Sequence, residues 1–236
     1  MLVLHRFTTP PHTCSYLADR LATLEYALAL MLSPQEYEDL MNSGHRKFGV
    51  AVFKPVCSGC SLCRPIRVPV ATFQPDRSQR RNLKRNQDLQ VRSADPVCDA
   101  QRLALYNRYH AAQARQKGWP DHPTGSEEYE TTLVQNPIPS VEISVWEGEV
   151  LRGLIINDLT PNSVSAVYHF YDPDCSERGL GTFCILQSIA LARKLGKRWL
   201  YLGYYVKGCA SMEYKLRFRP CEILSEDGAW KLNHEP

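Results

Sequence analysis

The chain lacks any run of about 20 apolar residues, the length that a helix needs to cross a lipid bilayer. Its start, Met1 to Arg6, also lacks the long apolar core of a secretory signal peptide. The nine cysteines are odd in number and partly clustered, which does not suit a disulfide framework. These absences predict a soluble, cytoplasmic protein whose thiols are reduced or bound to metal.

A strong net charge is also missing, because the formal value of +3 is too small to indicate a partner by itself. The 236 residues, 44% of them hydrophobic, are enough for one large domain or two smaller ones with a real core. We divide the chain at the break before Pro75, into a small cysteine-containing N-terminal domain (1–74) and a larger domain (75–236).

Cysteines recur every third residue, at Cys57, Cys60 and Cys63, in a loop flanked by Gly and Pro. Such a loop can wrap around one ion, and Cys14 can supply a fourth thiolate. Zinc and an iron–sulfur cluster both accept four cysteines, and the spacing does not choose between them. The alternative is reduced thiols that pack as small hydrophobes or take part in redox chemistry.

A second cluster is cationic and falls in the helix predicted over residues 76–86. Its five basic residues recur at helical spacing, so they share one face, and no acidic residue interrupts the run. They are Arg77, Arg80, Arg81, Lys84 and Arg85. We expect this face to bind the phosphate backbone of a nucleic acid, although an ordinary solvated helix face is the alternative.

Residues 141–205 predict the core of an α+β fold. Three alternating strands at 141–147, 150–159 and 164–171 form an antiparallel meander, then a helix at 180–195 leads to a parallel strand at 201–205. The turn before the helix contains Gly179, Gly181 and Thr182. Its unpaired backbone N–H groups and the helix dipole favour an anion such as phosphate, unless the glycines only permit a tight turn.

Periodicity predicts the remaining elements. They are a helical pattern through Leu21, Leu24, Ala27 and Leu28, a helix from Pro34 to about Ser43, strands at 48–53 and 66–73, a helix through Leu103 to Ala114, and a loop at 118–126.

Seven ordered blocks give the chain a resemblance to the arginyl-tRNA–protein transferase family, and most to its bacterial aspartate/glutamate leucyltransferases. The blocks are Cys14 to Leu17, the cysteine triad with residues 65–68, Ser78 to Arg81, Tyr171 to Asp174, Leu180 to Thr182, Tyr201 to Tyr205, and Met212 to Pro220. Eukaryotic members carry a second cysteine where Leu17 stands and paired cysteines in place of the triad, which moves the expected donor toward leucyl-tRNA.

The resemblance implies an acetyltransferase-like (GNAT) fold and an aminoacyl transfer from tRNA to the α-amine of proteins that begin with Asp or Glu. This marks those proteins for degradation. An aminoacyl ester is already activated, so the reaction needs alignment and oxyanion stabilisation rather than a cofactor. The basic helix would hold tRNA, and the turn at 179–182 would face its acceptor end.

Individual roles follow as hypotheses. The resemblance to the fold implies that backbone N–H groups near Tyr168 to Tyr171, or near Tyr204, polarise the carbonyl. Tyr204 or Tyr205 would position groups or relay a proton; the alternative is that these aromatics form strand core. Cations at Arg67, Lys215 and Arg219 are candidates for binding the acidic side chain, against a role as ordinary surface charges.

Three other functions remain open from the sequence. An arginyltransferase would act on the same acceptors. A small-molecule acetyltransferase would bind acetyl-coenzyme A, although Ser176 stands where such enzymes usually have Gln or Arg. A metal-stapled RNA-binding module would bind RNA without turnover.

Overall fold

The computed structural model describes residues 1–118 and 122–233, and in these ranges the strands form a large sheet of eight, an N-terminal sheet of four and a two-stranded ribbon. The orders are β14-β13-β7-β12-β11-β10-β9-β8 in the large sheet, β1-β4-β6-β5 in the N-terminal sheet and β2-β3 in the ribbon. The strands are β1 Leu2–Thr8, β2 His12–Thr13, β3 Leu21–Ala22, β4 Leu24–Met31, β5 Arg46–Phe48, β6 Ala51–Pro55, β7 Cys63–Pro69, β8 Gln90–Ala94, β9 Ser140–Glu147, β10 Val150–Leu159, β11 Ser163–Tyr171, β12 Trp199–Val206, β13 Glu222–Leu224 and β14 Trp230–Leu232. The α-helices are α1 Pro34–Asn42, α2 Arg77–Arg85, α3 Ala100–Lys117, α4 Ser126–Tyr129, α5 Leu180–Lys194 and α6 Ala210–Glu213, with shorter helical turns η1 Glu130–Val134, η2 Pro173–Arg178 and η3 Tyr214–Arg217.

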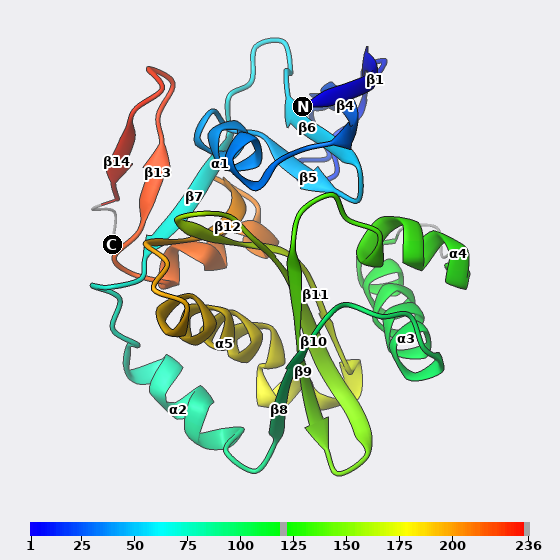
Figure 1. Ribbon diagram of the computed structural model, residues 1–236, viewed down its shortest axis with the longest axis vertical. Helices are drawn as coiled ribbons and strands as arrows, with labels where there is room; N and C mark the ends of the chain where they lie inside the picture. Colours follow the sequence, from blue (N-terminus) through cyan, green and yellow to red (C-terminus); the bar gives the residue numbers. More distant parts are fainter. Residues whose placement is uncertain (119–121, 234–236) are drawn as a thin grey trace.

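The centre of the large sheet confirms the predicted meander. β9, β10 and β11 pair in antiparallel order, and β12 joins β11 in parallel after α5. Helices α5 and α2 lie on one side of this sheet and α3 on the other (Figure 1). The apolar side chains of α5, such as Phe183 and Ile189, are buried against the sheet and form the main core. The predicted helices at 34–43, 76–86, 103–114 and 180–195 are likewise confirmed.

The helical pattern predicted through Leu21 to Leu28 is wrong, because this segment forms β3 and β4. Strand β4 pairs with β1 on one side and β6 on the other, and its residues Ala27 and Ala29 alternate into the core. Leu, Glu and Ala favour helices in isolation, but ladder pairing on two sides outweighs that preference. The strand predicted at 48–53 is a hairpin of β5 and β6, which turns at Gly49 with φ +53°.

Buried charges join the N-terminal sheet to the large sheet. Lys47 of β5 lies 3.0 Å from Asp158 of β10, and both side chains are fully buried. Glu38 of α1 accepts hydrogen bonds from the Thr160 hydroxyl at 3.0 Å and from the backbone N–H of Asn162 at 3.1 Å. Breaking such a pair leaves an uncompensated buried charge, so the relative placement of the two sheets is firmly specified.

Strand β7 lies inside the large sheet, between β12 and β13, although we assigned its residues to the N-terminal domain. Strands β8, β13 and β14 were not predicted from the sequence. Residues 119–121 of the loop predicted at 118–126 lie outside the described residues. Among the helices of the described ranges, none is long and apolar enough to span a membrane.

Candidate active site

A cavity of about 530 Å³ opens where β11 and β12 diverge. In the described part of the chain the two strands pair over Ser163–Ser165 and no further. Beyond that point Val167 is an extra residue opposite β10, because Ala166 pairs with Asn157 and Tyr168 with Ile156. Because of this bulge and the separation of β11 from β12, backbone N–H and C=O groups of β11 on the cavity side make no hydrogen bonds to a neighbouring strand. The lining residues are Ser15, Tyr16, Asp76, Ser78, Gln79, Tyr109, Gln113, Ala166, Val167, Tyr168, His169, Tyr171, Gly179, Gly181, Thr182, Ile185, Leu202, Ser211, Met212, Tyr214, Lys215, Arg217 and Phe218.

Two cations from distant segments occupy the gap between the strands. Arg46 of β5 donates to Ser165 Oγ at 3.0 Å and to the carbonyl of Ala166 at 2.7 Å. Lys215 of η3 donates to the carbonyl of Tyr204 at 2.7 Å and lines the cavity. Burial, followed by the charge of Arg46, lowers the pKa of Lys215 to about 7. Among the described residues, no carboxylate contributes to the electrostatics of this buried ammonium.

The first turn of α5 faces the cavity with its backbone donors uncapped. Gly179 precedes the helix at φ +63°, and no side chain in the described ranges caps the N–H groups of this turn. On the opposite side, Asn82 of α2 donates to the carbonyls of Arg178 and Gly179, at 2.9 and 3.0 Å. Since Gly179 and Thr182 line the cavity, the positive end of the helix dipole points toward it.

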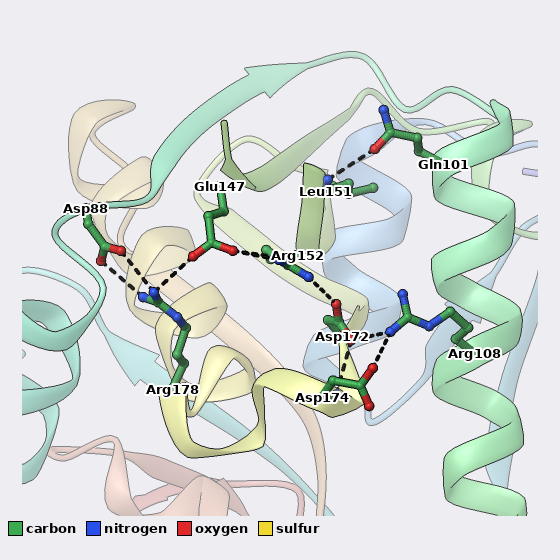
Figure 2. Close-up of polar contacts among 9 residues, drawn as sticks. All are labelled: Asp88, Gln101, Arg108, Glu147, Leu151, Arg152, Asp172, Asp174 and Arg178. Atoms are coloured by element: carbon green, nitrogen blue, oxygen red, sulfur yellow. Dashed lines mark hydrogen bonds and ion pairs between the residues drawn. The ribbon is translucent and has the colours of Figure 1, made fainter. Parts of the chain in front are cut away.

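A chain of ion pairs holds the segment that leads into α5. The fully buried carboxylate of Asp172 accepts from Arg108 at 2.7 Å and from Arg152 at 2.8 Å, and Arg152 also contacts Glu147 (Figure 2). The chain continues through Glu147 to Arg178 of η2 and ends at Asp88. Contacts at both ends of η2 therefore fix the turn that presents the start of α5.

The basic face of α2 lies next to the same cavity. The five predicted cations are all exposed, and the first turn of the helix supplies Asp76, Ser78 and Gln79 to the cavity wall. Asp76 itself caps α2, because its carboxylate accepts from the backbone N–H of Gln79 at 2.7 Å.

Strand β11 directs neighbouring side chains to opposite faces of the sheet. Tyr168 turns toward α3, where its hydroxyl lies 2.9 Å from His110 Nε2, although part of the residue lines the cavity. His169 and Tyr171 lie on the cavity side, with their rings stacked at 6.3 Å. His169 was not predicted as a site residue. Because side chains alternate along a strand, it lies on the opposite face of the sheet from Tyr168, and this alternation could have indicated it.

Other predicted site residues lie outside the cavity and make internal contacts. The hydroxyl of Tyr204 donates to the carbonyl of Gly44 at 2.9 Å, and Tyr205 packs in the main core. Arg219 is exposed on the surface.

Arg67 is also held by internal contacts. Its guanidinium stacks between Trp199 and Trp230, at 3.8 and 4.1 Å from the ring centroids, and pairs with Glu222 at 2.7 Å. Of the three cations proposed for an acidic side chain, Lys215 is the one that lines the cavity.

The predicted metal ligands gather near one another. The pKa of Cys63 is raised to about 12, first by burial and then by the neighbouring thiols of Cys14, Cys57, Cys60 and Cys209. Among the described residues, however, no three Cys, His, Asp or Glu side chains are arranged to hold a metal ion. Metal binding by the four predicted cysteines stays a prediction, and Cys209 is an unforeseen fifth thiol in this cluster.

Comparison with solved structures supports the fold. The crystal structure of FemX superposes with a TM-score of 0.52 over 91% of this chain and 84% of that chain, at 7% sequence identity. With the meander and the crossover through α5, this confirms the predicted α+β, GNAT-like acyltransferase fold.

Sequence comparison then gives the family. An aspartate/glutamate leucyltransferase of Pseudomonas syringae pv. syringae (strain B728a) is 40% identical over 225 residues, 93% of each chain. The protein of the same name from Pseudomonas fluorescens (strain Pf0-1) is 39% identical and covers 92% of each chain. Residues 12–81 match the N-terminal part of the arginine-tRNA–protein transferase family, and residues 101–225 match its C-terminal part. The chain therefore belongs to the arginine-tRNA–protein transferase family, whose substrates are aminoacyl-tRNA and protein.

Proposed function

We propose that this protein transfers leucine from leucyl-tRNA to the α-amine of proteins that begin with Asp or Glu. The observation that carries the proposal is a single cavity that combines an uncapped helix start, an apolar floor and a buried ammonium group. The names of the relatives at about 40% identity support the same reaction. The product carries an N-terminal leucine, which marks it for degradation, and we expect the reaction to take place in the cytoplasm, where charged tRNA is available.

The donor enters along α2. The exposed cations of this helix bind phosphates of the tRNA, and the acceptor end passes from there to the first turn of α5, whose free N–H groups suit a phosphate or a carbonyl oxygen. Arg217, which also lines the cavity, adds positive charge on this path.

The floor of the cavity favours leucyl over arginyl as the transferred group. Ile185, Leu202 and Phe218 are buried there, and their side chains belong to the apolar core. An arginyl side chain would need a carboxylate partner. Among the described lining residues the acidic one is Asp76, whose carboxylate is already engaged as the cap of α2.

The acceptor is held by Lys215. An Asp or Glu side chain that enters the cavity meets this ammonium, and the pairing of two otherwise isolated charges in a buried site strongly favours the acidic residue over Ala. The same pairing keeps Lys215 protonated above the pKa of about 7 that it has in the free protein.

The chemistry is aminolysis of an ester. The neutral α-amine attacks the carbonyl carbon of the leucyl ester, and the developing oxyanion is stabilised by free backbone N–H groups of β11 beside the bulge at Val167. Because the ester is already activated, alignment of the two substrates supplies most of the acceleration.

Transfer of radiolabelled amino acids tests the proposal. Leu and Arg, each on charged tRNA, are offered with peptides that begin with Asp, Glu, Lys or Ala. Leu transfer restricted to Asp and Glu is the expected result. Arg transfer would correct the donor, whereas tRNA binding without transfer of either would refute the proposed reaction.

A further inference from the structure

The imidazole of His169 lies beside the reacting groups of the proposed reaction. The residue lines the cavity from the unpaired part of β11. A Cβ built on Gly181 would lie 3.3 Å from His169 Nε2, so this nitrogen borders the first turn of α5. The ring is therefore next to the helix start where the ester is bound and on the same cavity wall as the bulge that stabilises the oxyanion.

The ring nitrogens of His169 are available to a ligand. Within the described residues, no hydrogen bond engages either of them, and the ring is held in place by stacking on Tyr171. Burial, followed by the charge of Lys215, lowers the pKa of His169 to about 4. The other ionisable residues that line the cavity from α3, β11 and η3 are Tyr109, Tyr168, Tyr171, Tyr214 and Arg217, and the pKa values of the four tyrosines are all raised. At neutral pH the imidazole is thus uncharged, with a lone pair on one ring nitrogen. A carboxylate paired with Lys215 offsets the charge of Lys215, the second of the two causes that lower the pKa of His169, and so makes the ring a better proton acceptor.

We propose that His169 accepts the proton of the attacking α-amine and passes it to the leaving ribose oxygen of the tRNA, a role that rests on the proposed function. The amine nitrogen forms a bond to the ester carbonyl carbon, and the carbonyl electron pair moves to oxygen. The nitrogen then carries a positive charge and gives one proton to His169. When the carbonyl re-forms, the bond to the ribose oxygen breaks, and that oxygen leaves with the electron pair and takes the proton from the imidazolium. His169 ends the cycle neutral.

The His169 ring is better placed to carry the proton than the other ionisable groups near the cavity. Lys215 is engaged with the carbonyl of Tyr204 and, in the proposed function, with the acceptor carboxylate. The hydroxyl of Tyr168 is directed at His110, on the α3 side of the sheet. His169 faces the cavity and has no competing partner among the described residues.

The experiment compares His169→Asn and His169→Ala with the wild-type protein in single-turnover transfer from leucyl-tRNA to a peptide that begins with Asp. Loss of a proton shuttle lowers the transfer rate by about 100-fold or more. Binding of leucyl-tRNA and KM for the peptide are expected to stay within about 3-fold, since both anchors are elsewhere. Added imidazole is expected to restore much of the transfer rate of His169→Ala. If the role of His169 were purely structural, free imidazole would not restore the rate.

His110→Asn is the matched control, because this second histidine contacts β11 from the opposite face and does not line the cavity. It is expected to keep wild-type transfer. A transfer rate for His169→Asn within about 3-fold of wild type would overturn the shuttle, and so would a loss in His169→Ala that imidazole does not rescue. Absence of transfer by the wild-type protein would instead count against the proposed function, so the two failures are distinguishable.

Discussion

Replacement of Lys215 by Met is expected to make the protein more stable and less selective. The aliphatic part of Lys215 already lies in a buried position, which Met fills with a similar shape and no charge. Lowering the lysine pKa from its ordinary 10.5 to about 7 corresponds to a penalty of roughly 5 kcal/mol for holding the charged form in the folded protein. The variant removes that penalty.

The gain is partly offset because the carbonyl of Tyr204 loses its donor, which costs about 1–3 kcal/mol. A net stabilisation of about 2–4 kcal/mol is expected at neutral pH, which raises the melting temperature by roughly 4–16 °C for a chain of this size. The pH dependence has a defined sign. Between pH 7 and 10.5 the unfolded chain binds more protons at this lysine than the folded protein does, so wild-type stability rises with pH across this window. Lys215→Met lacks this contribution.

Selectivity changes in the opposite direction to stability. Loss of a charge-assisted hydrogen bond worth about 1.5–3 kcal/mol lowers kcat/KM for a peptide that begins with Asp by roughly 10- to 150-fold, and the peptide that begins with Ala is little affected. In the wild type, kcat/KM for the Asp peptide should be greatest at about pH 7–8, between deprotonation of the α-amine and loss of the Lys215 proton.

Urea unfolding and transfer kinetics on the same preparations test both effects. Arg219→Met serves as the control, since this cation is exposed and outside the cavity, and it should change neither stability nor selectivity. A Lys215→Met protein that is less stable than wild type and still prefers Asp over Ala would refute the reasoning.

Three further changes test the other parts of the site. Gly181→Ala brings a Cβ within 3.3 Å of the rings of β11 and should lower transfer by about 10- to 100-fold. Ala is also the better helix former, so thermal melting should show no loss of stability, and unchanged kinetics would contradict the close packing. Replacing Arg80, Arg81 and Lys84 together by Ala should reduce the slope of log affinity for tRNA against log salt by about 2–3; an unchanged slope would remove α2 from the tRNA path. Asp172→Asn, which weakens two arginine contacts, should cost about 2–3 kcal/mol in urea unfolding and lower transfer through the displaced start of α5, and full activity would show that the ion-pair chain does not position that turn.

The elements that the sequence predicts correctly are those with strong local signals. The meander alternates with period two, α5 begins after a glycine turn, and α1 carries a complete capping box at Ser33 and Glu36. The errors occur where pairing between distant segments decides the structure. Leu24–Met31 has the composition of a helix, yet two neighbouring strands hold it in a sheet. The short strand β13 pairs with β7, about 150 residues away in the chain, and β14 joins the sheet through β13, so a short local pattern does not predict them.

The same distinction applies within the site. Gly179 and Gly181 were predicted at an anion-binding turn because a glycine turn before a helix is a local feature, and both line the cavity. Lys215 was nominated as one of three cations, but the choice among them depends on the stacking that engages Arg67 and on the exposure of Arg219.

At the edges of the gap between β11 and β12, two cations that lie 169 positions apart in the chain, Arg46 and Lys215, donate hydrogen bonds to backbone carbonyls. Two like charges in a buried gap repel each other, and that repulsion contributes to the low pKa of Lys215. In the proposed function, the carboxylate of the acceptor would relieve this repulsion and offset a charge that destabilises the free protein. Local sequence patterns cannot reveal such a site, since neither cation is unusual in its own segment and the repulsion arises only when the two sheets are assembled.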